Sequence, residues 1–489
     1  MITWQSLLNS VGWIYAILNV ALAGFSLHML ILLILSIKHR NDRIPETTCR
    51  DEDLPTVLVQ LPVYNERYVV ERLIDAAVAI DYPVDKIIIQ VLDDSTDVTT
   101  TLAQKRVAFH VNAGRNVQFI HRTDRKGYKA GALSQGLQAA PGEFMAIFDA
   151  DFIPPKNFLR AIIPMFLQDH KLGVVQSRWE HLNLDQNAIT HVIGQALDIH
   201  FAIDQIARSR SGLLMNFNGS CCVLRRACVE DAGGWQDDTL VEDLDLSYRV
   251  QMKGWRITYR PDVTVPGELP ASIISFKQQQ FRWAKGTVQA LRKLGWRLLT
   301  SNRTLPQKLE GLFHLTSYFT SPLMIITYLL SLPVVYLFGH LPFNSALLGV
   351  AVLIPPIAAA WSQARLRTNW WRSVLFYPVL FLTGIGVSLT ITQAIWEAII
   401  GHKSEFVRTP KFSNAHPQSS VYALSVDRAT WVELLMAAYG IGTSILAVER
   451  APTLAPFIMI YAFAFLLTAG MSLANVSRSV QTRRLNQDA

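Results

Sequence analysis

The chain of 489 residues alternates between long apolar runs and a central region where short apolar runs end in acidic residues. Val11–Ile37 contains no Asp, Glu, Lys or Arg and is long enough to cross a bilayer. The basic residues that follow it predict that its amino terminus lies outside. Met1–Ser10 carries no charged side chain, so a cleavable signal peptide is not expected. We therefore interpret residues 1–40 as a membrane anchor.

Residues 41–300 have the pattern of an α/β domain. Arg67–Ile80 has apolar residues at helical spacing and is closed by the turn at Asp81–Pro83, and another helix is expected to open near Tyr128. Four short apolar runs alternate with such helices and are predicted to be buried strands: Thr56–Leu61, Ile87–Leu92, Val117–Ile120 and Phe144–Phe148. This alternation predicts a mainly parallel sheet of the nucleotide-binding type.

Two of these predicted strands end in paired acids. Asp149 and Asp151 follow the fourth strand, and Asp93 and Asp94 follow the second. Open α/β sheets bind ligands beyond the carboxyl ends of their strands. Two carboxylates one residue apart favour a divalent cation that also carries substrate phosphates, although a solvated acidic turn would look the same. Asp93 and Asp94 could accept hydrogen bonds from a nucleotide base and ribose, or could be turn residues that cap a helix.

Residues 301–489 return to apolar character. If the basic loop 362–372 lies inside, the membrane-length segments form two hairpins. Val374–Ile400 is also long enough to span, but Pro378 and two glycines interrupt it, and a span here would move the basic loop 401–411 outside. We expect it to be an interfacial or re-entrant helix. The anchor then joins four further spans: Leu312–Phe338, Leu341–Trp361, Trp431–Leu446 and Pro452–Leu473.

Composition agrees with a chain that is part membrane bundle and part soluble domain. Half of the residues are hydrophobic, 17% are charged, and the mean hydropathy is +0.23. The net charge of +7 is explained by membrane orientation, and nucleic-acid binding is not implied. The four cysteines show no paired metal spacing, which fits a reducing compartment. This orientation places the central domain and the carboxyl terminus in the cytosol.

An ordered series of motifs runs from about Leu54 to Gly286. Its members are QLPVYNE (60–66), QVLDDSTD (90–97), KGYKAGAL (126–133), IFDADF (147–152), VQSRW (175–179), FNGS (217–220), VEDLDLSYR (241–249) and QQFRW (279–283). The series resembles that of membrane-embedded inverting glycosyltransferases of family 2, and most closely the cellulose-synthase-like proteins that make mannan, glucomannan or glucan backbones. The resemblance implies a GT-A type α/β domain at 41–300, inserted between the anchor and a channel domain at 301–489, in the plasma (inner) membrane.

The resemblance assigns the donor side of the site to residues that chemistry also favours. Lys129 lies at the amino end of the helix after Gly127, where an ammonium and free backbone donors suit a diphosphate, although a solvated helix lysine is common. Asp149 and Asp151 would hold Mn²⁺ or Mg²⁺, with Asp151 the better candidate for direct ligation. Asp93 and Asp94 are the nucleotide-binding candidates.

Glu242 and Asp243 are the catalytic candidates. Inverting transfer needs a carboxylate opposite the leaving group to take the proton of the acceptor hydroxyl, and Asp243 resembles that base. Many family members have Thr at the position of Val241. The mannan and glucan synthase-like branch shares this departure from Thr. Acids that begin an amphipathic helix at its favourable dipole end would show the same spacing.

The acceptor side is expected to involve Asn218, Gly219 and the QQFRW motif. Trp283 offers a flat face to a sugar, and Gln279 and Arg282 would face the donor diphosphate. An Arg-Trp pair is otherwise an ordinary interfacial anchor. Phe406–Lys411, within a candidate gating loop at 401–425, resembles the gating loop of cellulose synthases, although its residue order differs.

The sequence therefore predicts a processive β-glycan synthase that uses UDP-glucose or GDP-mannose, extends a growing glycan on the cytosolic face and passes it through the membrane bilayer, with any accessory export proteins unspecified. A non-processive transferase that adds one sugar to a membrane lipid is the alternative enzyme. A transporter with a nucleotide-sensing domain would carry charges in mid-span and repeated halves, and neither is evident.

Overall fold

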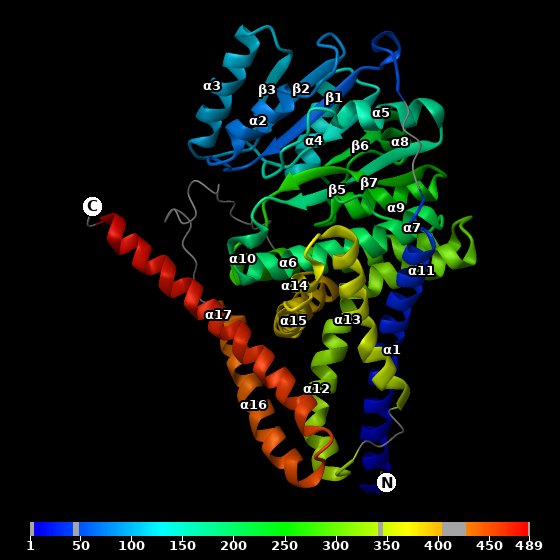
Figure 1. The fold of residues 1–489 in the computed structure, drawn as a ribbon, viewed down its shortest axis with the longest axis vertical. Helices are drawn as coiled ribbons and strands as arrows, with labels where there is room; N and C mark the ends of the chain where they lie inside the picture. Colours follow the sequence, from blue (N-terminus) through cyan, green and yellow to red (C-terminus); the bar gives the residue numbers. More distant parts are fainter. Residues whose placement is uncertain (1–3, 43–47, 341–345, 403–426, 488–489) are drawn as a thin grey trace.

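The structure is a computed structural model, and it describes residues 4–42, 48–340, 346–402 and 427–487. A sheet domain lies above a set of long helices that run away from it (Figure 1). The candidate gating segment Phe406–Lys411 lies outside the described residues.

The sheet has seven strands in the order β3-β2-β1-β4-β6-β5-β7. The first four strands along the chain are mutually parallel, which confirms the strands predicted from the sequence. The strand β6 runs antiparallel to both of its neighbours, so the sheet is mixed where the sequence predicted only a mainly parallel one. The bounds are β1 Val57–Val63, β2 Ile87–Asp93, β3 Val117–His121, β4 Phe144–Ile147, β5 Leu172–His181, β6 Cys222–Arg225 and β7 Arg256–Gly267.

Both faces of the sheet are covered, because alternate strand residues enter two separate cores. Val57 and Val59 pack with the helices on one face, and Leu58 packs with the other core. The first core includes α2 (Val70–Val78), α3 (Thr99–Asn112) and α5 (Phe158–Gln168). The second includes α4 (Tyr128–Ala139), α8 (Arg226–Asp231) and α9 (Glu242–Met252). This three-layer arrangement exposes the carboxyl ends of β1, β2 and β4 at one edge.

Several helices lie between the sheet domain and the long helices. The bounds are α6 Ala188–Ile199, a π-helix η3 at His200–Gln205, α7 Ile206–Arg210, α10 Ile273–Thr300 and α11 Leu305–Thr316. In Figure 1, α6 and α10 lie beneath the sheet and across the direction of the bundle. They form the floor beneath the carboxyl edge of the sheet.

Within the described residues, five helical segments are long and apolar enough to cross a membrane: Ser10–Lys38, Leu305–Leu337, Trp370–Ile400, Arg428–Arg450 and Ala455–Ser477. Four of them contain spans predicted from the sequence. The helices concerned are α1 (Trp4–Lys38), α11 with η4 (Ser317–Phe319) and α12 (Thr320–Leu337), α14 (Trp370–Val374) with α15 (Tyr377–Ile400), α16 (Arg428–Arg450) and α17 (Ala455–Gln487). The chain is a membrane protein.

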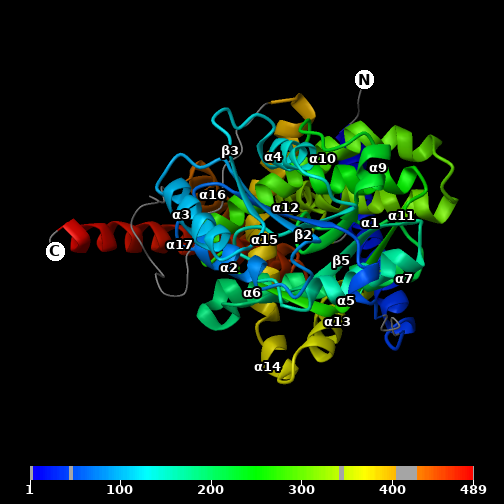
Figure 2. The ribbon, with the colours of Figure 1, turned by 90° about the horizontal axis from the view of Figure 1, so that it is seen from above.

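The segment that the sequence left ambiguous forms α15. By length and composition it qualifies as a span. Its axis nevertheless lies along the view of Figure 1, across the direction of α1, α12 and α13 (Ala346–Leu366). Figure 2 shows the same helix after a turn of 90°. It packs against α10, α12 and α17. The interfacial or re-entrant helix expected at Val374–Ile400 therefore stays a prediction. The helix α13, which contains most of the predicted span Leu341–Trp361, runs beside α1 but is not among the five segments found in the described residues.

Candidate active site

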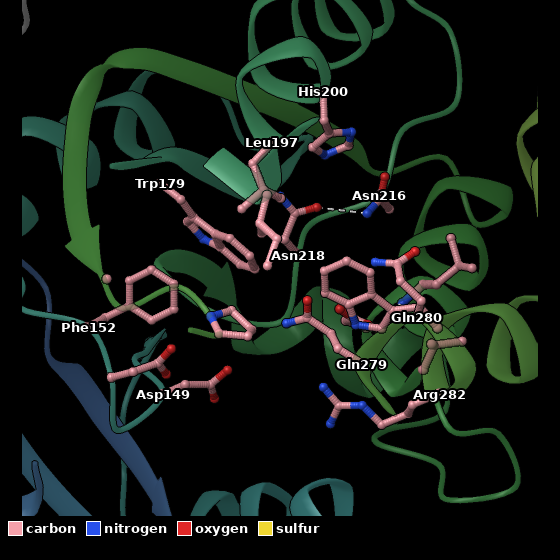
Figure 3. A pocket seen from close by; sticks show the side chains of 18 of the residues that line it. Asp149, Phe152, Trp179, Leu197, His200, Asn216, Asn218, Gln279, Gln280 and Arg282 are labelled. Atoms are coloured by element: carbon pink, nitrogen blue, oxygen red, sulfur yellow. Dashed lines mark hydrogen bonds between the residues drawn. The ribbon is translucent and has the colours of Figure 1, made fainter. Parts of the chain in front are cut away.

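A cavity of about 680 Å³ lies between the carboxyl edge of the sheet, α9, α10 and the ends of α1 and α11. Figure 3 shows Asp149 on one side and Gln279, Gln280 and Arg282 on the other. Its lining includes most of the residues singled out in the sequence: Asp94, Lys129, Asp149, Asp151, Asn218, Glu242, Asp243, Gln279, Arg282 and Trp283. These residues come from segments up to about two hundred positions apart, and the fold brings them to one space.

Lys129 lies at the centre of the donor side. Gly127, with φ 71°, ends the preceding loop in the left-handed region, and Lys129 stands in the first turn of α4 as the sequence predicted. Its ammonium donates to Asp149 Oδ1 at 2.5 Å and to the carbonyl of Gly219 at 3.0 Å. Burial disfavours its charge, but Asp149 and Glu242 outweigh burial and raise the pKa of Lys129. A permanent cation therefore faces the cavity.

Asp243 is half-buried in the first turn of α9, beside Glu242, and lines the cavity. Burial, and then the charge of Glu242, raise the pKa of Asp243 to about 7, while Lys129 and Arg282 oppose the rise. Its carboxylate accepts a hydrogen bond from the backbone of Leu244 at 2.8 Å. A carboxyl group with a pKa near neutrality is suited to accept a proton in a transfer reaction.

Gly219 makes a close approach that only glycine allows. Its φ is +73°, and a Cβ at this position would lie 2.9 Å from Oδ2 of Asp243. The neighbouring Asn218 is held in place, since its backbone N–H donates to Gln176 and its side chain accepts from Asn216 at 2.8 Å (Figure 3). The FNGS motif thus packs against the Asp243 carboxylate through Gly219 and lines the cavity through Asn218.

The two acids after β2 have different surroundings. Asp93 is fully buried, accepts from Thr100 and lies 2.8 Å from Nδ1 of His121, so it holds the loop and does not line the cavity. Asp93 thus supports the loop beside the cavity, and its expected contact with a nucleotide stays a prediction. Asp94 lines the cavity, but both of its oxygens accept from Arg122, at 2.5 and 2.6 Å. Asp94 therefore presents an ion pair to the cavity.

Tyr64 and Arg125 were not identified from the sequence. The Arg125 guanidinium lies 3.4 Å from the centre of the Tyr64 ring, and both residues line the cavity beside Asp94. Arg125 has a φ of 45°, and burial lowers its pKa. A flat cation stacked on an aromatic ring is a suitable surface for a nucleotide base. Tyr64 lies within the QLPVYNE motif, which was the available signal.

The QQFRW motif lies on α10 and carries the acceptor candidate Trp283 together with Gln279 and Arg282, which were expected to face the donor. Gln279, Gln280, Arg282 and Trp283 all line the cavity, and Figure 3 shows the Arg282 guanidinium pointing toward the space in front of Asp149. The side-chain carbonyl of Gln279 is buried without a hydrogen-bond partner in the part of the chain described. Such a group is costly unless a ligand pairs with it, which supports a ligand position here.

The end of the cavity near α1 is lined by charged side chains. Arg208, whose side chain is 1% exposed, donates to Asp204 at 2.8 Å. His200 lies 3.3 Å from the other Asp204 oxygen, and His28 lies 2.7 Å from Glu310. Tyr318 also lines the cavity. The π-helix η3, which carries His200 and Asp204, had no clear sequence signal.

A divalent cation is implied by the fold family, and the donor set can be tested against it. Asp149 and Asp151 both line the cavity and offer the hard oxygen ligands that Mn²⁺ and Mg²⁺ accept. Among the described residues no group of three or more His, Cys, Asp or Glu side chains gathers around one point. Two carboxylates fit a cation that is completed by the diphosphate oxygens of a donor, so the residues present fit a cation that arrives with its substrate.

A sheet with helices on both faces, paired acids after β4 beside a lysine, and a half-buried carboxylate across the cavity are typical of GT-A glycosyltransferases, and here they are carried on membrane helices. The model for "Glycosyltransferase like family 2" matches residues 55–286. A solved structure of mannosyltransferase PcManGT from Pyrobaculum calidifontis, in complex with GDP-Man and Mn²⁺, shares the fold with a TM-score of 0.52 and 21% identity, over 80% of this chain and 100% of that one.

Two proteins of Oryza sativa subsp. japonica extend the likeness. Probable glucomannan 4-beta-mannosyltransferase 3 is 42% identical over 249 residues, which is 50% of this chain and 45% of that protein. Glucomannan 4-beta-mannosyltransferase 1 is 32% identical over 420 residues, which is 82% of this chain and 80% of that protein. The chain thus spans less than half of the first relative. It belongs to the family 2 glycosyltransferases, and the relatives it matches are glucomannan 4-beta-mannosyltransferases of the cellulose-synthase-like type.

Proposed function

We propose that this protein is a processive β-glycan synthase that transfers mannose or glucose from a nucleotide sugar to a growing chain and passes that chain through its membrane helices. The observation that carries the proposal is the continuity of the cavity. The same space is lined by Lys129 and Asp149, by Trp283, and by Met29 and Leu32 of α1. An acceptor seated at Trp283 has the donor site on one side and membrane helices on the other.

The donor side binds and orients the leaving group. Lys129 and the amino end of α4 neutralise a diphosphate, and Arg282 faces the same space. Asp149 and Asp151 would hold a divalent cation, and this cation would supply charge neutralisation to a departing nucleoside diphosphate. The Arg125 and Tyr64 pair provides a flat surface for the base.

Asp243 takes the proton of the acceptor hydroxyl. That hydroxyl oxygen attacks the anomeric carbon from the side opposite the diphosphate, the bond to the diphosphate breaks, and the configuration at the carbon inverts. Because burial raises the pKa of Asp243, its carboxylate holds the transferred proton more readily than an exposed aspartate would. Gly219 leaves space for this carboxylate, and Glu242 maintains its raised pKa.

The sugar and its carrier follow from the relatives. The rice proteins are named for transfer of mannose into glucomannan, and the solved neighbour holds GDP-Man and Mn²⁺. We therefore place GDP-mannose first and UDP-glucose second as donors. The basic residues beside the apolar segments support a cytosolic sheet domain and carboxyl terminus in the plasma (inner) membrane, with the amino terminus outside. The domain bounds 1–40, 41–300 and 301–489 are part of the same proposal.

Reconstituted protein tests the proposal directly. Purified protein in lipid vesicles is incubated with each nucleotide sugar in turn, with Mn²⁺ or Mg²⁺, and the product is digested with linkage-specific β-glycosidases. We expect a polymer with GDP-mannose that a β-mannanase degrades. A lipid that carries one added sugar with every donor would instead identify the non-processive enzyme.

A further inference from the structure

Two buried lysines flank the acceptor motif on α10. Lys277 lies two residues before Gln279, and Lys285 lies two residues after Trp283. Their side chains are 2% and 1% exposed, although lysine is almost never fully buried unless it is paired. Eight helical residues span about 12 Å, so these two charges enclose the whole motif.

Lys277 is held by two helices of the carboxyl-terminal bundle. Its ammonium lies 2.7 Å from Oε1 of Glu433 on α16, whose side chain is 0% exposed. It also donates to Ser472 on α17 at 2.9 Å. Asp427, which caps the amino end of α16, is 3.9 Å away. The amino-terminal side of the motif is therefore tied to α16 and α17 by directional contacts.

Lys285 is held by α15 in the same way. Its ammonium donates to Oε2 of Glu397 at 2.8 Å, and Gln393 donates to the other oxygen of that carboxylate at 3.1 Å. Further along α10, beyond Gly286, Arg292 donates to the carbonyl of Ala398 at the end of α15. The carboxyl-terminal side of the motif is therefore tied to α15.

The same helix also lies against the segment that carries the proposed base. A Cβ on Gly286 would lie 2.6 Å from Val241, the residue before Glu242, so the two segments are in close contact. Gln289 accepts from the backbone of Leu240 at 2.9 Å. The acceptor motif and the proposed base therefore lie on adjoining segments, and the position of α10 sets the distance between them.

We propose that Lys277 and Lys285 are positioning residues: their ion pairs with Glu433 and Glu397 hold α10 so that an acceptor at Trp283 is aligned with Asp243. This rests on the proposed function, because it assumes that the motif binds the acceptor. Buried ion pairs add little net stability over apolar pairs of similar volume, but they fix geometry through direction and distance. The membrane helices thereby set the acceptor geometry of the transferase domain.

The test uses the full-length protein in lipid and four variants. Lys277→Met leaves a buried carboxylate unpaired, Lys277→Met with Glu433→Met removes both charges, and Lys277→Glu with Glu433→Lys exchanges them. Arg297→Met is the matched control, since Arg297 is an exposed cation on the same helix. The measurements are the KM of a short oligosaccharide acceptor, the KM of the donor, and hydrogen exchange of peptides that cover 278–284.

In Lys277→Met we expect the acceptor KM to rise about 10- to 100-fold, as expected for a displacement of about 1 Å, with the donor KM within about threefold. Exchange across 278–284 becomes faster. The exchanged pair restores both readouts toward wild type. The double Met variant regains thermal stability yet keeps a raised acceptor KM, because apolar contacts lack direction.

Three results would overturn the proposal. They are an equal rise in the donor KM and the acceptor KM, an unchanged acceptor KM in Lys277→Met, and a wild-type acceptor KM in the double Met variant. If Lys277→Met does not fold, the exchanged pair and the double Met variant decide. If wild type extends no acceptor, the proposed function fails, and exchange at 278–284 shows separately whether the ion pairs hold α10.

Discussion

Replacing Asp243 with Asn separates the chemistry of the base from the binding of substrates. The amide is nearly isosteric and keeps the hydrogen bond from the backbone of Leu244, but it cannot take a proton at neutral pH. Loss of a positioned general base costs about 10²- to 10⁴-fold in rate, or about 3 to 5 kcal/mol of transition-state stabilisation. We expect this loss in kcat, with the donor Kd unchanged.

The same substitution should not weaken the fold. A rise in the pKa of Asp243 from 3.8 to about 7 means that ionisation in the folded state costs about 4 kcal/mol relative to the unfolded chain. For a carboxyl group whose folded pKa is raised, this cost develops as pH rises from about 4 to about 7 and is complete above that range. The amide introduced by Asp243→Asn carries no such charge, so the melting temperature of this variant should equal or exceed that of wild type, most clearly above pH 7.

The assay follows release of nucleoside diphosphate and polymer together, beside calorimetric donor binding and a melting curve from pH 4 to 8. The matched control is Asp238→Asn, an exposed carboxylate on the loop before α9 that pairs with Lys293. It should lose no more than a few-fold in rate. Transfer by Asp243→Asn within a few-fold of wild type would exclude Asp243 as the base, and a large loss of donor binding would assign it to binding instead.

Three further predictions follow from the same cavity. Gly219→Ala should reduce transfer about tenfold or more, because its Cβ would lie 2.9 Å from the Asp243 carboxylate. Gly212→Ala controls for backbone strain, since Gly212 has a similar φ of +66° and nothing within 4 Å. Equal effects of the two substitutions would refute the role of the contact. A chelator should abolish turnover, and Mn²⁺ or Mg²⁺ should restore it in wild type but poorly in Asp151→Ala, whereas full turnover in the chelator would leave the acids without a metal role. Trp283→Ala should shorten the polymer much more than it raises the donor KM, and an unchanged length distribution would argue against stacking of the acceptor.

Local pattern predicted much of the fold because the decisive signals lie close together in the sequence. The apolar runs at β1, β2 and β4 and the helical spacing at α2 each extend over fewer than fifteen residues, and all four formed as expected. The strand β6 was not predicted, since its direction depends on pairing with β4 and β5, which lie far away in the chain. The bilayer role of α15 was ambiguous for a similar reason: its composition suits a span, and its contacts with α10 and α17 give it its direction.

Local sequence likewise predicted one part of the site, and contacts between distant segments determine the rest. The position of Lys129 at a helix start and the exposure of Asp149 to the cavity followed from local sequence. The different surroundings of Asp93 and Asp94 could not be predicted from local sequence, because they depend on contacts with His121 and Arg122. These partners lie 28 residues away, on β3 and at the residue after it. Two adjacent acids at a strand end point in different directions, so one faces inward and the other faces the cavity.

The charges at the membrane end of the cavity change what a path for a sugar chain requires. An unpaired charge there would hold water and ions. The structure instead pairs them: Arg208 donates to Asp204, and His28 of α1 lies 2.7 Å from Glu310 of α11, 282 residues away. A paired set is close to neutral, so it attracts ions weakly, yet it still presents donors and acceptors to sugar hydroxyls. His28 itself stacks on Phe313 at 4.8 Å, which fixes its ring. This end of the cavity is therefore kept close to neutral by pairing its charges, and it does not lack charges. The sequence of one segment alone shows only an isolated histidine in an apolar run.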